Sequence, residues 1–197
     1  MSCGSNLVVK RRFRFASWNI GLLTDKSMEL IDVIRKIMVN VACIQETRWK
    51  GSKAKGLDDF KLWCLGNECG RGGVEIVVDK DLKNDIVDVK RLGDRILAIK
   101  LVLGDEIFNI VCDYAPQEGL DGRVKVQLWE HMDEMMQGLD QEERIIIGGD
   151  LNDHAGKDHR CYEDVHGGYG VGERNAEGTS VLEFAITHDL CIANTFF

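Results

Sequence analysis

The sequence has little proline, no long apolar run and no excess of positive charge. A single proline, Pro116, stands in 197 residues, so no proline-rich linker divides the chain. The apolar runs are far shorter than the roughly 20 residues that a membrane-spanning helix needs. The N-terminal segment also lacks an apolar core followed by small residues, as in a signal peptide. We therefore expect a protein that is neither secreted nor in contact with a membrane, nuclear or cytoplasmic.

The seven cysteines are an odd number, and none of them forms a C-x-x-C pair. This pattern argues against a disulfide framework and favours reduced, mostly buried thiols. The net charge of −8 argues against nucleic-acid binding by bulk electrostatics. A nucleic-acid partner would need a basic patch or a divalent metal in an acidic pocket. One candidate patch is KRRFR at residues 10–14, although a solvated lead-in to the first strand is the preferred interpretation.

The composition is that of one globular domain, with 44% hydrophobic and 29% charged residues. We predict a lead-in over residues 1–12 and a single domain over residues 13–197. Apolar periodicity predicts a β-α-β opening, a middle rich in hairpins and further helices and strands. The predicted strands are 13–18, 41–45, 60–65, 73–79, 95–103, 106–115, 144–149 and one beginning in 190–194; the predicted helices are 25–39, 122–139 and 177–188, with a loop over 157–175. Two packed sheets with helices outside them fit this order.

The stretch IIIGGDLNDHAG, residues 145–156, ends an apolar strand in glycines and then in polar side chains. Asp150 and Asn152 are two positions apart, so they point to one side if the extended geometry persists. A carboxylate can bind or deprotonate water, and an amide can hold that water or donate to a phosphate oxygen. An Asx-rich turn that only caps the strand explains this stretch alone equally well.

Three other predicted strands also end in polar side chains. Asn19 ends FASWNI, Glu46 follows VACIQ, and Tyr114 precedes the proline in VCDYAPQ. Carboxylate, amide and hydroxyl ligands without a thiolate suit a hard ion such as Mg²⁺ or Mn²⁺. If the strand ends converge, the sequence predicts a metal site at one rim of the fold.

The motifs SWNI, IQETRW, YAPQ and GGDLNDHAGKD, in this order, resemble those of the endonuclease/exonuclease/phosphatase superfamily. The stretch YEDVHGGYGVGERNAEGTSVLEFA is similar to endonuclease domains of LINE-type retrotransposons, notably of the RTE kind, and to host proteins derived from them. The resemblance covers nearly the whole chain after residue 12. It implies an α/β fold, a four-layer α/β sandwich of two packed sheets flanked by helices, and metal-dependent cleavage of DNA phosphodiesters.

The resemblance also implies roles for individual residues. Glu46 and Asp150 would hold Mg²⁺ (or Mn²⁺), with Asn19 beside the metal and facing the substrate. Asp150 would orient or deprotonate the attacking water, Asn152 would support it, and Tyr114 would contact the scissile phosphate. Asn175 matches an asparagine of the family that faces the nucleic acid.

One departure from the family pattern affects the expected activity. Family members carry a later strand ending in Asp and a final Ser-Asp-His motif, and neither occurs before Phe197. Asp158-His159 follows the Asp150 motif too closely, and THDL at 187–190 has the reverse order, so we reject both as substitutes. We expect an incomplete sandwich with an exposed sheet edge and impaired catalysis.

Two other interpretations remain open from the sequence. A domesticated retroelement fragment without activity could act as a binding or interaction module. Alternatively, a zinc site could form from ligands of suitable type within thirteen positions, although their spacing matches no standard zinc pattern; these are His154, His159, Cys161 and His166.

Overall fold

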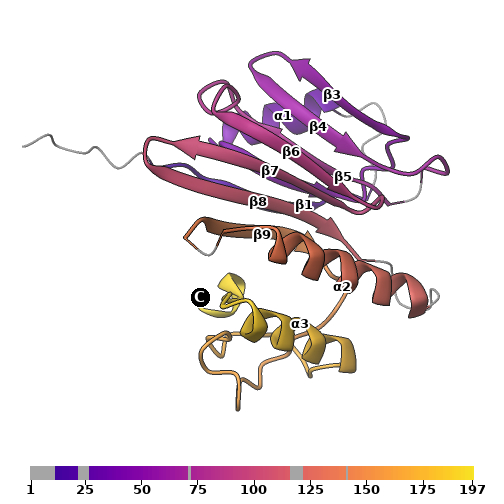
Figure 1. The fold of residues 1–197 in the computed structure, drawn as a ribbon, viewed down its shortest axis with the longest axis vertical. Coiled ribbons are helices and arrows are strands. Elements are labelled where there is room, and N and C mark those ends of the chain that lie inside the picture. Colours follow the sequence, from indigo (N-terminus) through magenta and orange to yellow (C-terminus); the bar gives the residue numbers. More distant parts are fainter. Residues whose placement is uncertain (1–11, 22–26, 71, 116–121, 141) are drawn as a thin grey trace, which may run out of the picture.

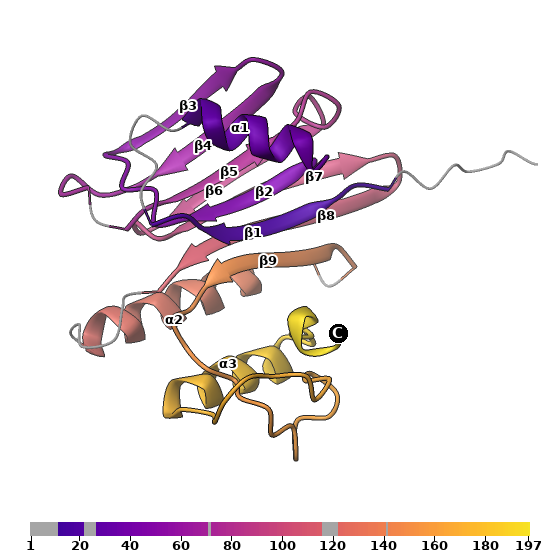
Figure 2. The same cartoon turned by 180° about the vertical axis from the view of Figure 1, so that it is seen from behind.

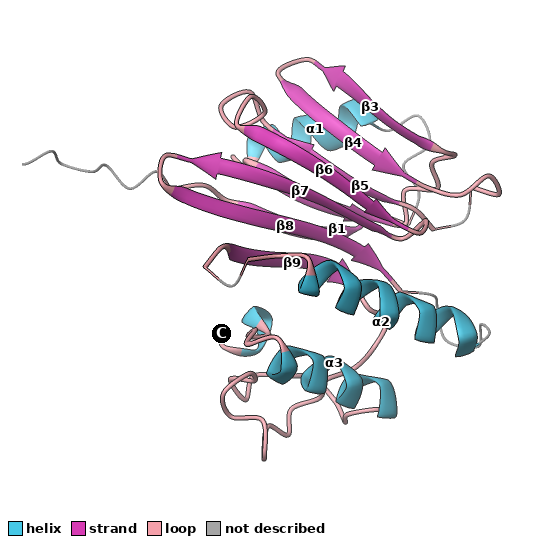
Figure 3. Cartoon of the chain, viewed as in Figure 1, coloured by secondary structure: helices cyan, strands magenta, loops and turns pink. Residues whose placement is uncertain are grey.

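The computed structural model describes residues 12–21, 27–70, 72–115, 122–140 and 142–197. Its nine strands, three α-helices and one short 3₁₀ helix are shown in Figure 1 and coloured by type in Figure 3. Their order is β1 (Phe15–Asn19), α1 (Ser27–Lys36), β2 (Val41–Gln45), β3 (Ser52–Leu57), β4 (Phe60–Leu65), β5 (Val74–Val78), β6 (Ile86–Leu92), β7 (Ile96–Leu103), β8 (Glu106–Tyr114), α2 (Gly122–Gln137), β9 (Arg144–Asp150), α3 (Ala176–Thr187) and η1 (Ala193–Thr195).

The strands form two sheets that pack face to face. One sheet has the order β1-β2-β5-β4-β3 and the other has the order β6-β7-β8-β9. Between them lies the largest apolar core, which includes Ile76, Leu97, Ile99 and Ile110, each 0–1% exposed. This arrangement confirms the predicted α/β sandwich.

A helix covers the outer face of each sheet. Leu30, Ile31 and Ile34 of α1 pack on the outer side of the five-stranded sheet, as Figure 2 shows from behind. Met132 and Met135 of α2 pack on the outer side of the four-stranded sheet. The methionines of α2 therefore fill core space, as the sequence predicts.

The sandwich has an open edge at β9, which pairs only with β8 among the described strands. The run Ile145–Ile147 is only partly buried there, in keeping with the exposed edge expected from the sequence. Helix α3 lies away from both sheets, beyond α2 (Figures 1 and 2). None of the described helices is long and apolar enough to cross a membrane.

Three elements differ from the sequence prediction. Strand β3 is polar, SKAKGL, and β6 is largely exposed, so neither has the apolar run that marks a buried strand. The strand predicted from residue 190 is wrong. This segment turns into η1, because it packs on the preceding loop through Ile192 N to Val165 O (2.9 Å) rather than on a sheet.

Candidate active site

Four strands from the two sheets end at the same rim of the sandwich. In one sheet β1 and β2 run parallel, with Asn19 opposite Gln45. In the other sheet β8 and β9 run parallel, with Tyr114 opposite Asp150. The carboxyl ends of parallel strands lie at one edge, which is where ligand groups gather in α/β folds.

Asp150 lies at the centre of a hydrogen-bond network at this rim. Asn19 Nδ2 donates to Asp150 Oδ2 at 2.6 Å and so joins the two sheets. The backbone N–H of Asn152 donates to Asp150 Oδ1 at 3.0 Å. Gly21 N donates to Asn19 Oδ1 at 2.9 Å, which fixes the orientation of that amide. Asp150 is therefore held by two donors while it stays partly exposed.

Tyr114 and Glu46 lie beside this network. The pKa of Tyr114 is raised, first by burial and then by the charges of Glu46 and Asp150, while a hydrogen bond with Asn152 opposes the shift. Both carboxylates are thus close enough to act on the hydroxyl, which stays protonated and able to donate. Glu46 has a positive φ of 57° directly after β2 and pairs with Arg48 at 3.1 Å.

Close packing beneath the rim explains the two glycines before Asp150. A Cβ at Gly148 would lie 2.6 Å from Phe15 Cζ, and one at Gly149 would lie 1.7 Å from Asp113 Oδ1. The buried Gln45 donates from Nε2 to Ser17 Oγ (3.1 Å) and to the carbonyl of Gly148 (3.0 Å). Its amide therefore ties β1 and β2 to β9 directly below the site.

Comparisons with known proteins give the same assignment as the motifs. Residues 16–182 match the endonuclease/exonuclease/phosphatase family. The chain belongs to this family. Craniofacial development protein 2 of Bos taurus is 22% identical over 190 residues, which are 95% of this chain and 32% of that protein; the Tragulus javanicus protein is 21% identical over 95% and 33%. The chain therefore spans about a third of the length of these relatives.

Solved structures of the same fold include two nucleic-acid enzymes. An AP endonuclease from Archaeoglobus fulgidus matches with a TM-score of 0.56 and 19% identity, over 77% of this chain and 59% of that one. The endonuclease domain of TRAS1, a telomere-specific non-LTR retrotransposon, matches with a TM-score of 0.53 and 18% identity, over 89% and 70%. The fold expected from the family motifs is thus confirmed.

A buried acid that the motifs did not reveal lies next to the family site. Asp113 is 0% exposed, and neither of its carboxylate oxygens has a hydrogen-bond partner. Burial, and then the charge of Asp150, raises its pKa to about 7. Because side chains alternate along β8, Asp113 faces the α2 side with Val111 and Ala115. The charged residue within the apolar run VCDYA was the available signal.

Asn175 lies at the start of α3, outside the Asp150 network. Its Oδ1 accepts from Gly178 N at 2.7 Å and from His154 N at 3.1 Å. The side-chain oxygen therefore caps the helix and ties it to the loop after β9. These bonds give Asn175 a structural role, and its contact with nucleic acid stays a prediction.

The four potential zinc ligands do not form a site. His166 is buried, and both of its ring nitrogens bond to backbone atoms, to Gly156 O and Gly168 N at 3.0 Å each. His159 stacks on His166 with the ring centroids 6.3 Å apart. Across the described segments, no three His, Cys, Asp or Glu side chains are arranged to hold a metal. The zinc interpretation therefore has no support in the fold.

Proposed function

We propose that this chain is a DNA endonuclease domain of retrotransposon origin that cleaves phosphodiester bonds with Mg²⁺ or Mn²⁺. The observation that carries the proposal is the carboxylate of Asp150, which is held between the Asn19 side chain at the end of β1 and the backbone N–H of Asn152 in the loop after β9. A positioned carboxylate at the ends of parallel strands is suited to handling the proton of an attacking water. The match with the TRAS1 domain supports the retrotransposon origin.

The donor set at the rim fits a hard divalent ion. Glu46 and Asp150 supply carboxylate oxygens, and no thiolate is involved. Mg²⁺ in phosphate-cleaving sites is bound by one or two carboxylates, with waters and substrate oxygens completing the shell. Two protein carboxylates are therefore sufficient, which is consistent with the lack of a larger ligand cluster among the described residues. When bound, the ion would offset negative charge on the phosphate.

The remaining steps belong to the side chains. Asp150 accepts a proton from the attacking water, while Asn19 and the N–H of Asn152 hold its two oxygens in place. Tyr114 keeps its proton, because burial and the adjacent carboxylates raise its pKa, and donates to a phosphate oxygen. The Asn152 side chain is fixed because its Nδ2 donates to Ala115 O at 2.9 Å.

No histidine takes part in this network. All five histidines lie in described segments, and two of them bond elsewhere through their ring nitrogens, His166 to Gly156 and His188 to Asp133. A positioned acid that protonates the leaving oxygen contributes roughly 10²–10⁴-fold to a rate. We therefore expect these 197 residues to nick DNA slowly, close to background.

Nicking of supercoiled plasmid tests the proposal. We expect weak Mg²⁺-dependent nicking by the chain, a large increase when a family segment with a Ser-Asp-His motif is fused to it, and loss of that increase in the fusion carrying Asp150→Ala. Asp59→Ala, a surface acid outside the site, is the matched control and should nick like the parent fusion. Increased nicking that survives Asp150→Ala would contradict the assignment of Asp150.

The lack of a histidine at the site favours a second candidate, a binding module without catalysis. This candidate predicts that the fused segment restores no nicking, while the chain still binds DNA. The same experiment therefore separates the two functions.

A further inference from the structure

A basic strip leads away from the candidate site along one end of the five-stranded sheet. From Glu46 to Gly56 the sequence has four cations, and Glu46 itself is its one acid, in a chain whose net charge is −8. We call these cations the basic rim; they are Arg48, Lys50, Lys53 and Lys55. The rim begins two residues after Glu46, so it is continuous with the site.

The path of the chain fixes the direction of this strip. After β2 it passes the ends of β5 and β4 to reach β3 at the far edge of the sheet. Three strand spacings of about 4.8 Å give a span of roughly 14 Å, which corresponds to about four base steps along duplex DNA. Backbone bonds fix the strip at Arg48 N to Gly72 O (2.7 Å) and at Gly66 N to Gly51 O (2.9 Å). The basic rim is therefore a built edge of the sheet.

Trp49 holds two of the lysines in place. The Nζ atoms of Lys53 and Lys55 lie 4.1 and 4.3 Å from the centroid of its ring. The indole is itself fixed, because its Nε1 donates to the buried Glu75 Oε2 at 2.7 Å. A ring that orients two ammonium groups concentrates positive charge at one place and reduces the entropy lost when an anion binds.

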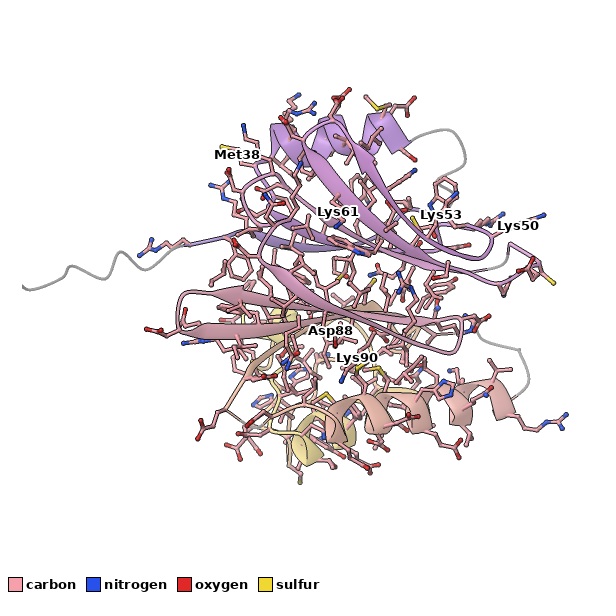
Figure 4. The ribbon with its side chains drawn as sticks, turned by 45° about the horizontal axis from the view of Figure 1, so that its top comes forward. Met38, Lys50, Lys53, Lys61, Asp88 and Lys90 are labelled. Atoms are coloured by element: carbon pink, nitrogen blue, oxygen red, sulfur yellow. The ribbon has the colours of Figure 1, made fainter. Side chains whose placement is uncertain are left out.

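Two lysines of the basic rim have their charge available, whereas Lys55 is partly buried and donates to Ser27 Oγ at 3.2 Å. Lys50 and Lys53 are exposed and lie at the same end of the sheet (Figure 4). Within the described part of the chain, neither lysine forms an ion pair. Met38 marks the opposite end in the same view. Phosphates bound by these lysines would lie at the end of the sheet that carries the site rather than at the opposite end.

We propose that the basic rim binds the sugar-phosphate backbone of duplex DNA next to the scissile bond. This inference rests on the proposed function and gives that site a direction for its substrate, from the Asp150 network toward β3. It also accounts for DNA binding by an acidic protein, because the contact needs only a local strip of cations. Phosphate contacts position the duplex without reading its sequence.

The salt dependence of DNA binding tests this proposal. Binding of a short labelled duplex is measured by fluorescence anisotropy in EDTA over a range of KCl concentrations, so that no cleavage occurs. The variant Lys50→Gln/Lys53→Gln should lower affinity several-fold and reduce the slope of log K against log salt by about 1.8, or 0.9 for each phosphate contact. Thermal unfolding checks that the variant is folded.

The matched control is Lys36→Gln/Lys80→Gln, which removes the same charge from exposed lysines at the opposite end of the sheet. It should leave the slope unchanged. The proposal for the basic rim would be overturned by equal losses of affinity and slope in both double variants. It would also be overturned by no change in either variant, or by no DNA binding of the parent. Nicking of the same proteins in Mg²⁺ is scored separately. If nicking depends on Asp150 but the salt slope of Lys50→Gln/Lys53→Gln is unchanged, only the proposed function is retained. If DNA binding depends on the basic rim but no nicking occurs, only the basic rim is retained.

Discussion

Asp150 and Asp113 lie on neighbouring strands, and the fold treats their carboxylates in opposite ways. Asp150 is partly exposed and receives hydrogen bonds from Asn19 and Asn152. Asp113 is fully buried and receives no hydrogen bond from another residue, and only its own backbone N–H acts on the carboxylate. Hydrogen bonds favour the charged form of an acid, whereas burial without them favours the neutral form. The comparison shows that Asp150 is held by donors where a water can reach it, whereas burial, the main cause of the raised pKa of Asp113, keeps that carboxyl away from any attacking water.

The largest effect is expected from Asp113→Asn, which removes the buried acid while keeping its shape. The folded pKa of Asp113 is about 7, against 3.8 when unfolded. Only the folded state keeps the proton between these values, so the stability contributed by Asp113 is fully present below about pH 4 and is lost as pH rises to about 7. A shift of about three pKa units corresponds to roughly 4 kcal/mol.

Urea unfolding at several pH values measures this effect. The parent should lose stability between pH 4 and 7, and Asp113→Asn should remove most of that loss and be more stable than the parent at pH 8. Asp59→Asn, at an exposed acid, should retain the pH dependence of the parent. An unchanged pH profile in Asp113→Asn would show that Asp113 is not the buried titrating group.

The next effect is expected from Asn19→Ala, which removes a donor from Asp150. Hydrogen bonds to charged groups contribute about 1.5–3 kcal/mol, so nicking by the fused domain should fall by roughly ten- to a hundredfold. Asn40→Ala is the control, because Asn40 makes the same kind of bond to Asp79 (2.5 Å) at the opposite end of the sheet. That variant should lose stability but not activity per folded molecule, and equal loss of activity in both would contradict the comparison.

The smallest effect is expected from Trp49→Phe, which would leave the buried Glu75 with a thiol as its donor. Glu75 keeps one unpaired oxygen, while its other oxygen accepts from the indole at 2.7 Å and from Cys64 Sγ at 3.3 Å. Burial raises its pKa. Losing the indole donor should cost about 1–3 kcal/mol at pH 8 and less at pH 5, where Glu75 is more protonated. Unfolding at the two pH values measures the difference, and an equal cost at both would refute this explanation.

The sequence predicted the parts of the fold that depend on apolar runs. The buried strands, the hairpin turn at Gly104 and the methionine face of α2 all follow from local pattern. Strand β3 did not, because an edge strand with Lys53 and Lys55 resembles a loop. The last predicted strand failed because LCIAN has the composition of a strand but no neighbouring strand among the described residues.

The site was predictable only to the level of residue types at strand ends. The polar ends Asn19, Tyr114 and Asp150 do meet, since parallel strands place them at one rim. The bond between Asn19 and Asp150 was not predictable, because it depends on how the two sheets are aligned. The acid within the apolar run VCDYA was a signal for Asp113, but its burial without donors depends on how β8 packs against α2, which the local sequence does not fix.

A Mg²⁺ titration followed by NMR tests whether the rim around Asp150 binds the ion, without depending on activity. We expect saturable shifts of the amide signals of Glu46, Asp150 and Asn152 and of the Asn19 side chain. These shifts should disappear in Asp150→Asn, and the loop with His154 and His166 should give none. Saturable shifts that persist in Asp150→Asn, or no saturable shift at this rim in the parent, would contradict binding of the ion by Asp150.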